Sequence, residues 1–504
     1  MFNFQFPYWK TPLINKKISD GGKTILKDED FILREIHKFK SSKRRFDMLK
    51  GIAYYNGDQD ILKRKRTCIG EKGDMEEVTN IPNNKIVDNQ YKKLVTQKIN
   101  YLLGKSFTLD SSKEYSIKLR KILNRKFMTA LRNVCQDSIN CGIGYMYIYY
   151  NNEGELDFKV IKPWEVIAGW SDDEHTKLDY AIRFYETLEY EGKKECVKNK
   201  VEVFDKIGIR RYEIKNGKLI NDGAKWKTPY FYYKGKDLSW DKIPLIPFKY
   251  NEETPLLKNV KTLQDGLNLI ISNFQNAMEE EPRNTIMILK NYDGENLGEF
   301  RKNLATYGAV KVSTFDGVEG GIETLNIEVN CENYKCLIDI FKKAIIENGM
   351  GYDAKSDKLG SNPNMMNILS MYSDIDIDSI GMEKEYSTSI EKIIWFINTH
   401  LANTGQGNYM NENVNIVFNK NILINESELI DNCIKSKDML SNETIIAKHP
   451  WVTDPAREIK RISKEINNER KIDENGTFRK NNKGNNEPND NRNDKNQNST
   501  SSRN

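Results

Sequence analysis

The chain has 504 residues, and its 78 lysines and arginines nearly balance its 73 aspartates and glutamates, which leaves a formal net charge of +5. This balance excludes a polybasic nucleic-acid binder that depends on many phosphate-neutralising cations, so any contact with DNA must be local or weak. Seven scattered cysteines and four histidines argue against zinc and for a reduced cytosolic chain, while the absence of a signal peptide or an apolar run of about 20 residues argues against a membrane.

The N-terminal part is polar and charged, and we predict a helical arm over residues 1–53 with one helix at 28–49. Residues 54–82 look irregular. They contain the basic run Lys63-Arg64-Lys65-Arg66, which could contact phosphate, although a solvated face is the commoner explanation for such a run.

The stretch INYLLGKSFT, residues 99–108, contains the GKS of a phosphate-binding loop but has Ile99 where that loop needs a glycine. Apolar residues recur at helical spacing before it, which predicts a helix over 87–103 that stops at Gly104 and a short extended piece at 107–109. A phosphate-binding loop follows a strand and opens a helix, so this order of elements favours an ordinary helix end.

A second helix is predicted over 114–139, followed by Gly142-Ile143-Gly144 and a β-favouring run at 145–150. Turn residues at 151–154, 215–217 and 221–223 predict hairpins, and short strands are expected as far as residue 250. A dinucleotide site is not indicated, because the third glycine is missing and a strand follows the glycines. This region reads as a mixed α+β domain.

Apolar residues between 256 and 278 alternate at spacings of four and three, which predicts a long helix with a heptad pattern that stops at Pro282. A second helical pattern covers 334–348 and ends at Gly349-Met350-Gly351. The two helices bracket a small module, residues 283–330, with a strand at 285–289, a helix at 295–307 and a strand at 310–313.

A polar loop at 352–362 follows the glycines, and a long helix is predicted from 363 to about 401. Further helices are expected at 426–439 and 454–469, with a short helix capped by Ser441 and Thr444 before His449. Past Lys471 the residues lack apolar content, which predicts a disordered tail.

No constellation gives a catalytic argument or implies a cofactor. Asp374, Asp376, Asp378 and Glu385 match the first, third, fifth and twelfth places of a calcium loop. Ser379 stands where that loop needs glycine and helical periodicity continues on both sides, so a polar helix or a kink is favoured and no metal site is predicted. A non-enzymatic role is the leading class, in which copies placed around an axis would form a ring of polar loops.

The chain resembles the portal proteins of tailed bacteriophages, of the type found in siphophages of Gram-positive hosts. The stretches that carry the resemblance occur in the family's order: YYNGDQDI at 54–61, NNKIV at 83–87, INYLLGK at 99–105, YSDIDID at 372–378, LSNETI at 440–445 and PWVTDP at 450–455. Many relatives have a Ser-Gly turn where this chain has 361–366, so its loop departs from theirs.

The resemblance implies an α+β, mainly α, portal fold that assembles as a ring, a dodecamer in most members, in the virion at one capsid vertex and in the host cytoplasm during assembly. The implied parts are a wing at 54–255, a stem helix at 256–282, a clip at 283–331, a second stem helix at 332–348, a tunnel loop at 349–362, a long wing helix with its return at 363–425, crown helices at 426–470 and a tail at 471–504.

The resemblance further implies that double-stranded DNA passes through the channel and faces the tunnel loop at Asp353, Lys355, Asp357, Lys358 and Asn362. It places the terminase and head-completion adaptor contacts on the clip, where the candidate residues are Glu295, Lys302, Lys311 and Glu319. Scaffold and major capsid protein are the other implied partners. An oligomeric head-tail adaptor without DNA passage, or a DNA-processing enzyme, remains the alternative.

Overall fold

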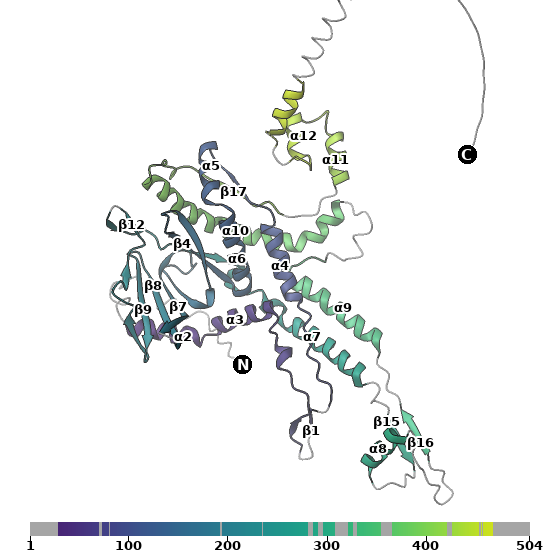
Figure 1. The fold of residues 1–504 in the computed structure, drawn as a ribbon. Helices are drawn as coiled ribbons and strands as arrows, with labels where there is room; N and C mark the ends of the chain where they lie inside the picture. Colours follow the sequence, from purple (N-terminus) through teal and green to yellow (C-terminus); the bar gives the residue numbers. More distant parts are fainter. Residues whose placement is uncertain are drawn as a thin grey trace, which may run out of the picture. The chain divides into compact units, whose positions relative to one another are not determined.

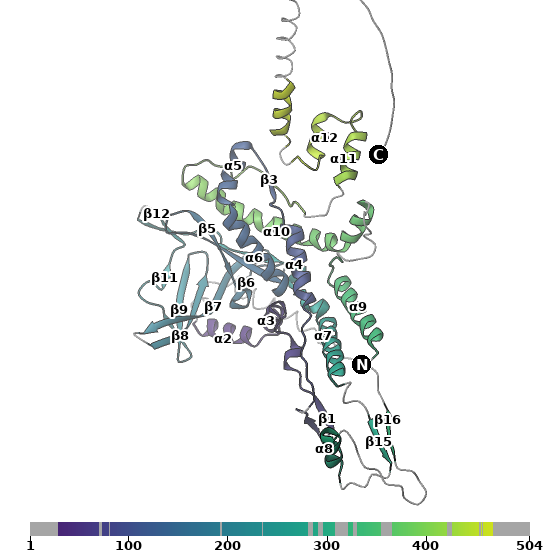
Figure 2. The same cartoon turned by 45° about the vertical axis from the view of Figure 1, so that its right-hand side comes forward.

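In the computed structural model the described residues are 29–69, 73–79, 81–191, 194–233, 235–280, 286–290, 296–307, 321–325, 330–353, 365–420, 426–452, 455 and 457–466. The chain divides into two compact units, Met1–Asp357 with Leu369–Ile422, and Lys358–Ile368 with Leu423–Asn504. Helices and sheets both contribute, so the fold is α+β (Figures 1 and 2).

The first helical region contains two helices, α2 (Glu29–Lys40) and α3 (Lys43–Asn56), and the prediction of one helix was wrong. Ser42 explains the break, because it has extended dihedral angles and its side chain accepts a hydrogen bond from the Arg45 amide as an N-cap. Gly57 ends α3 in the left-handed conformation, with φ of 97°.

The GKS stretch ends a helix, as predicted. α4 (Gln90–Leu103) is followed by Gly104, and the short strand β3 (Thr108–Asp110) comes next. The predicted helix at 114–139 is in fact two, α5 (Lys113–Ile122) and α6 (Arg125–Cys141). Asn124 interrupts the helix, since its side chain caps α6 by accepting from the Lys126 and Phe127 amides.

The first unit contains two larger sheets that share a core. The smaller sheet has the order β14 (Leu245–Lys249), β4 (Ile143–Tyr150) and β5 (Leu156–Ile161), all antiparallel. The larger has the order β10 (Lys218–Asn221), β9 (Ile209–Lys215), β8 (Lys194–Phe204), β7 (Leu178–Glu191) and β6 (Val166–Trp170), and β11 (Lys227–Thr228) also pairs with β9. The predicted hairpins at 151–154 and 215–217 are confirmed, whereas the one at 221–223 was wrong, because β10 and β11 both pair with β9 and not with each other.

Strand β4 is apolar on both faces because each face lies in a different core. Ile143 and Tyr145 belong to a core with the larger sheet, whereas Met146 and Ile148 belong to the main core with α4, α6, α7 and α10. The alternation of side chains along a strand makes this possible. A third core lies on the opposite face of the larger sheet, where Ile32 and Ile36 of α2 are buried.

Small elements complete the sheet region. They are the hairpins β1 (Thr67–Ile69) with β2 (Met75–Glu77) and β12 (Phe231–Tyr233) with β13 (Lys236–Leu238), the pair of β3 with β17 (Asn415–Val417), and the short helices η1 (Asp60–Lys63), η2 (Pro163–Glu165) and η3 (Asn251–Glu253).

Two helices pack against each other beyond the sheets, and both were predicted as helices. They are α7 (Leu257–Glu280) and α9 (Cys331–Asn348). Between them in the chain come β15 (Ile286–Lys290), α8 (Leu297–Tyr307) and β16 (Gly321–Leu325). The strand that pairs with β15 is β16, which the sequence did not predict, and the strand expected at 310–313 lies outside the described residues.

The long helix is α10 (Met365–Asn403), 39 residues in length and continuous. In the second unit, α11 (Glu426–Lys435) and α12 (Asn442–Lys448) are followed by helical residues at 457–466. Ser441 caps α12 by accepting from the Thr444 amide, as predicted. The tail expected after 471 lies outside the described residues.

Candidate functional site

The end of α9 and the start of the loop after it pack tightly on α4. A Cβ atom added to Gly349 or to Gly351 would lie 2.4 Å from a methyl carbon of Leu94, which is itself buried. Met350 between them has φ of 50°. Both glycines are therefore required by close packing, and they set the direction in which the chain leaves α9.

Side chains of α4 hold the base of this loop. Gln97 donates from Nε2 to the Tyr352 carbonyl at 2.9 Å, and Lys98 donates from Nζ to the Met350 carbonyl at 3.1 Å. Lys98 also forms an ion pair of 2.7 Å with Asp378 of α10. Burial lowers the pKa of Lys98, and the negative charge of Asp378 opposes this shift. One buried cation thus joins the loop base, α4 and α10.

A second connection from α4 to α10 runs through aromatic residues. The Tyr101 hydroxyl donates to Asp376 at 2.9 Å, and the Tyr101 ring stacks on Tyr372, which also contacts Tyr352 of the loop base. Burial tends to raise the pKa of Asp376, but hydrogen bonds from Lys420 and Tyr101 outweigh it, and the pKa is lowered. Helix α4, which ends within the INYLLGK stretch, therefore contacts both the loop base after α9 and helix α10.

The acidic residues that matched a calcium loop lie on the uninterrupted helix α10, so a calcium-binding loop is not formed there. Asp376 and Asp378 bind side chains of α4, and Asp378 also accepts from the Tyr250 hydroxyl at 3.1 Å. Nowhere among the described residues do three His, Cys, Asp or Glu side chains come together in a way that could hold a metal ion.

Of the residues predicted to face the channel, the described part of the chain contains only Asp353, which is half-buried at the loop base. Lys355, Asp357, Lys358 and Asn362 lie outside it. Of the clip residues, Lys302 is exposed on α8, while Glu295, Lys311 and Glu319 lie outside the described residues.

A polar ladder on α7 was missed by the sequence analysis. It consists of four buried side chains spaced four residues apart, Gln264, Asn268, Ser272 and Asn276. They accept hydrogen bonds from the amides of Tyr91, Asp88, Ile86 and Asn84, at 3.1, 3.0, 3.0 and 2.7 Å. The regular spacing of amide and hydroxyl side chains at four-residue intervals was the signal available in the sequence.

The ladder binds residues 83–89, here called the strap, along α7. Two residues of extended chain advance about 6.6 Å and four residues of helix about 6 Å, so every second strap amide meets one ladder side chain. The ladder also satisfies the Tyr91 amide, one of the donors that the first turn of α4 leaves unpaired. The strap thereby fixes α4, and with it the loop base, to α7.

Helices α7 and α9 pack closely against each other. A Cβ atom on Gly266 would lie 2.5 Å from the Phe341 ring, and the rings of Phe274 and Tyr334 lie 5.0 Å apart. Lys342 of α9 forms an ion pair of 2.9 Å with Asp88 of the strap.

Two side chains of the basic run at 63–66 bind α7. Arg64 donates to Asn273 at 2.7 Å, and Arg66 forms an ion pair with Glu280.

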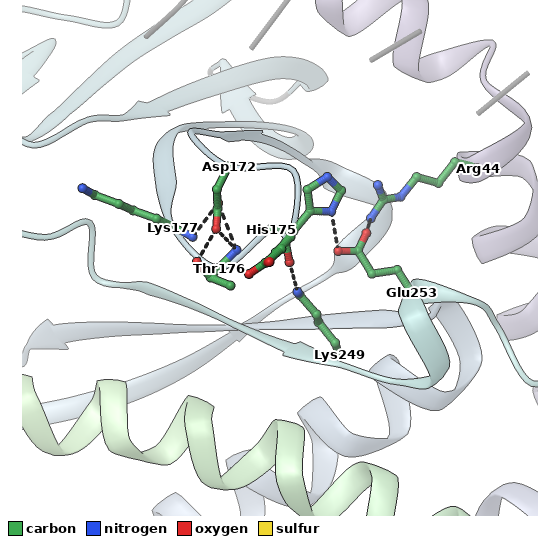
Figure 3. A network of polar contacts seen from close by, with 8 residues as sticks. Arg44, Asp172, His175, Thr176, Lys177, Lys249 and Glu253 are labelled. Atoms are coloured by element: carbon green, nitrogen blue, oxygen red, sulfur yellow. Dashed lines mark hydrogen bonds and ion pairs between the residues drawn. The ribbon is translucent and has the colours of Figure 1, made fainter. Parts of the chain in front are cut away.

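A network of polar contacts fixes the entry to α7 (Figure 3). Glu253 accepts from Arg44 of α3 at 2.6 Å and lies 2.7 Å from Nδ1 of His175, a residue of the turn between β6 and β7. Burial tends to raise the pKa of Glu253, yet the contacts with His175 and Arg44 prevail and lower it to about 2. The turn at 251–253 has positive φ at all three residues, which the network stabilises.

Comparisons with known proteins identify a family for this chain. Residues 34–471 match the family described as phage portal protein, SPP1 Gp6-like. The chain is 26% identical to the portal protein of Bacillus phage SPP1 over 472 residues, which cover 92% of each chain. It is also 26% identical to the portal protein of Clostridium phage phiCD119 over 430 residues, 82% of this chain and 90% of that protein. Among the described helices, none is long and apolar enough to cross a membrane.

Proposed function

The chain belongs to the SPP1 Gp6-like family of phage portal proteins, and from this premise we propose that its copies form a ring at one capsid vertex. Double-stranded DNA would be packaged through the central channel by a terminase and later ejected, and the tail connector would attach to the same ring. Portal proteins are structural components of the phage particle, and the sequence offers no catalytic constellation that would add an enzymatic role.

The observation that carries the proposal is the supported loop base between α9 and α10, in a chain that matches the family over residues 34–471. A loop that touches moving DNA needs a firm base, since a loose one would transmit no force. Lys98, Gln97 and the two glycines supply that base.

In the proposed particle the parts follow the family's order. Residues 1–53 form an arm and 54–255 the wing, 256–282 and 332–348 the stem, and 283–331 the clip. The tunnel loop is 349–362, the long wing helix with its return is 363–425, the crown is 426–470, and residues 471–504 form the tail.

We propose that the tunnel loop grips DNA weakly. Lys355 and Lys358 would approach the phosphate backbone, while Asp353 and Asp357 keep the loop close to neutral. Asn362 is the fifth residue proposed to face the DNA. Each tight phosphate contact would become a barrier to sliding, so a ring of nearly neutral loops suits the passage of DNA in both directions.

The clip is proposed to meet the terminase during packaging and the head-completion adaptor afterwards, with Glu295, Lys302, Lys311 and Glu319 as contacts. Scaffold and major capsid protein would surround the wing during assembly.

The test begins with electron microscopy and mass measurement on the purified chain, where rings of about twelve copies with a central hole are expected. A phage that lacks its own copy of the gene is then complemented with the chain. Heads that package DNA support the proposal. Heads that assemble with the ring but package no DNA favour an adaptor, and a monomer that cuts DNA or hydrolyses ATP overturns it.

A further inference from the structure

The hairpin of β7 and β8 extends beyond the strands beside it. β6 pairs with β7 only as far as Arg183, and β9 pairs with β8 only as far as Asn199. From Phe184 to Glu191, therefore, none of the described strands pairs with the outer edge of β7. Such an edge presents unpaired backbone amides and carbonyls to which an extended segment can add.

One face of this free part carries three exposed apolar side chains, although Glu186 and the opposite Asn199 lie between them and the base of the hairpin. Leu188 lies directly opposite Val197, and Tyr190 follows two residues later on the same face, with exposed fractions of 63%, 58% and 73%. Nearer the base of the hairpin, the same face carries Phe184 and is covered by Ile32 and Ile36 of α2. Beyond the part that α2 covers, this face therefore exposes Leu188, Val197 and Tyr190 to solvent.

The opposite face of the hairpin is covered by ion-paired charged side chains. Glu189 forms ion pairs with Lys198 at 2.8 Å and Lys200 at 3.3 Å, and Lys200 also binds Asp222 at 2.8 Å. The two faces of the hairpin therefore differ at its free end, and the exposed apolar side chains lie on the face of Leu188 and Tyr190.

The segment before α2 has the matching pattern. It begins MFNFQFPY, with Phe2, Phe4, Phe6 and Tyr8 at alternate positions, as in a strand with one apolar face. Pro7 lies among the intervening residues, whose amides point away from a partner strand when the even-numbered residues pair with it. A proline at such a position is tolerated in an edge strand.

The segment is also tethered at a suitable distance. Twenty residues, 9–28, separate Tyr8 from Glu29, the first residue of α2, and they can span up to about 70 Å. The hairpin end lies only about 20 Å along β7 from Phe184, which α2 and its neighbours cover. We propose that residues 2–8 add to the outer edge of β7 at 184–191 of the same chain, with their aromatic side chains over Leu188 and Tyr190.

Hydrogen exchange on the full chain tests this pairing. The outward-pointing amides of residues 184–190 are expected to exchange at least tenfold faster when Phe2, Phe4 and Phe6 are replaced together by serine. Replacing Asn3 and Gln5 by serine changes the same segment on its other face and should leave the rates unchanged. Equal rates in the native chain and the phenylalanine variant would overturn the proposal.

The reciprocal change gives an independent readout. Leu188→Ser with Tyr190→Ser should raise the exchange rates of residues 2–8 by a similar factor, whereas Glu189→Gln on the ion-paired face should not. If residues 2–8 exchange at the unprotected rate already in the native chain, no pairing exists.

A pair of introduced cysteines distinguishes pairing of residues 2–8 with β7 of the same chain from pairing with β7 of a second copy. Phe4→Cys with Leu188→Cys is prepared as isotopically heavy and light chains, which are unfolded and refolded together, oxidised and mapped by mass spectrometry. Crosslinked peptides that carry one label only are expected. Peptides that join heavy to light chains would assign the surface to a second copy, and the absence of any 4–188 crosslink above the single-cysteine controls would also contradict the proposal.

Discussion

Lys98 is the residue on which the loop base depends most directly. Its side chain is 1% exposed and that of its partner Asp378 is 14% exposed. Replacing Lys98 with methionine would leave a poorly solvated carboxylate without its cation, and we expect a loss of about 3 kcal/mol in the free energy of unfolding. The Met350 carbonyl also loses its donor, so the amides of Gly349 and Gly351 should exchange faster.

Lys93→Met is the matched control, because Lys93 is exposed on the same helix. Denaturant unfolding of the two variants compares them. Equal midpoints would mean that the ion pair of Lys98 and Asp378 contributes nothing to stability.

Asp137 of α6 should make stability depend on pH. Burial raises the pKa of its carboxyl from 3.8 to about 7, against the opposing charge of Lys162. The folded state therefore holds this proton more tightly than the unfolded state. Below about pH 4 the carboxyl is protonated in both states and does not reduce the free energy of unfolding. As the pH rises from about 4 to about 7 the reduction grows, and at higher pH it is constant.

Asp137→Asn should remove that reduction. The full shift corresponds to roughly 4 kcal/mol, and solvent at this partly exposed side chain reduces the expected gain at pH 8 to about 1–2 kcal/mol. Urea unfolding of the variant should show the gain shrinking as the pH is lowered from 8 to 5. Asp58→Asn, at an exposed site, is the control, and a gain independent of pH would contradict the assignment.

Among the elements, the polar ladder makes the most specific prediction. Asn268→Ala leaves the Asp88 amide without its acceptor and Gln59 without the Asn268 donor, both in a buried setting. We expect a loss of about 2 kcal/mol in the free energy of unfolding and faster exchange of the strap amides. Gln275→Ala, on the exposed side of α7, should change neither quantity. Retained protection of the Asp88 amide in Asn268→Ala would show that the ladder does not bind the strap.

Two helix glycines should respond in opposite ways to the same change. Gly266→Ala places a methyl group 2.5 Å from the Phe341 ring, so the ring or the helices must shift, and we expect a loss of about 1–2 kcal/mol in unfolding free energy. Gly381 of α10 has no atom near its added Cβ, and alanine there should stabilise the chain by about 0.5–1 kcal/mol through helix propensity. Thermal unfolding checks both, and a shift of the same sign in the two variants would contradict the packing described for α7 and α9.

The elements also show how far sequence reasoning reached. The long helices α7 and α10 and the strand β4 were predictable because their apolar patterns are long and regular. The breaks at Ser42 and Asn124 were missed because apolar periodicity continues across both, and only the capping side chains mark the boundary. The end of α9 was predicted correctly from its glycines. The contact of Lys98 with Asp378 joins residues 280 positions apart, and no local pattern encodes it.

On the scale of the assembled particle, the tunnel-loop proposal predicts a graded defect. Replacing Lys355 and Lys358 together by alanine removes the two proposed phosphate contacts of each copy, so heads should still assemble while packaging or DNA retention falls. Replacing Asp353 and Asp357 by asparagine raises the net charge of the loop and should slow sliding instead. Counting filled and empty heads by electron microscopy measures both, and unchanged packaging and retention in the lysine variant would refute the proposed contact.

The strap follows α7 for a limited distance, and its end is encoded in the chain. Four residues of helix advance slightly less than two residues of extended strap, so the mismatch between ladder side chains and strap amides grows by roughly half an ångström at each hydrogen bond. A fifth rung would place Glu280 opposite Pro82, which has no amide hydrogen to donate. Glu280 instead binds Arg66, and Arg66 donates to the Pro82 carbonyl at 2.7 Å. If α7 of this chain were lengthened, it would therefore gain helix without gaining strap, so α7 can vary in length while the anchorage of the loop base stays constant.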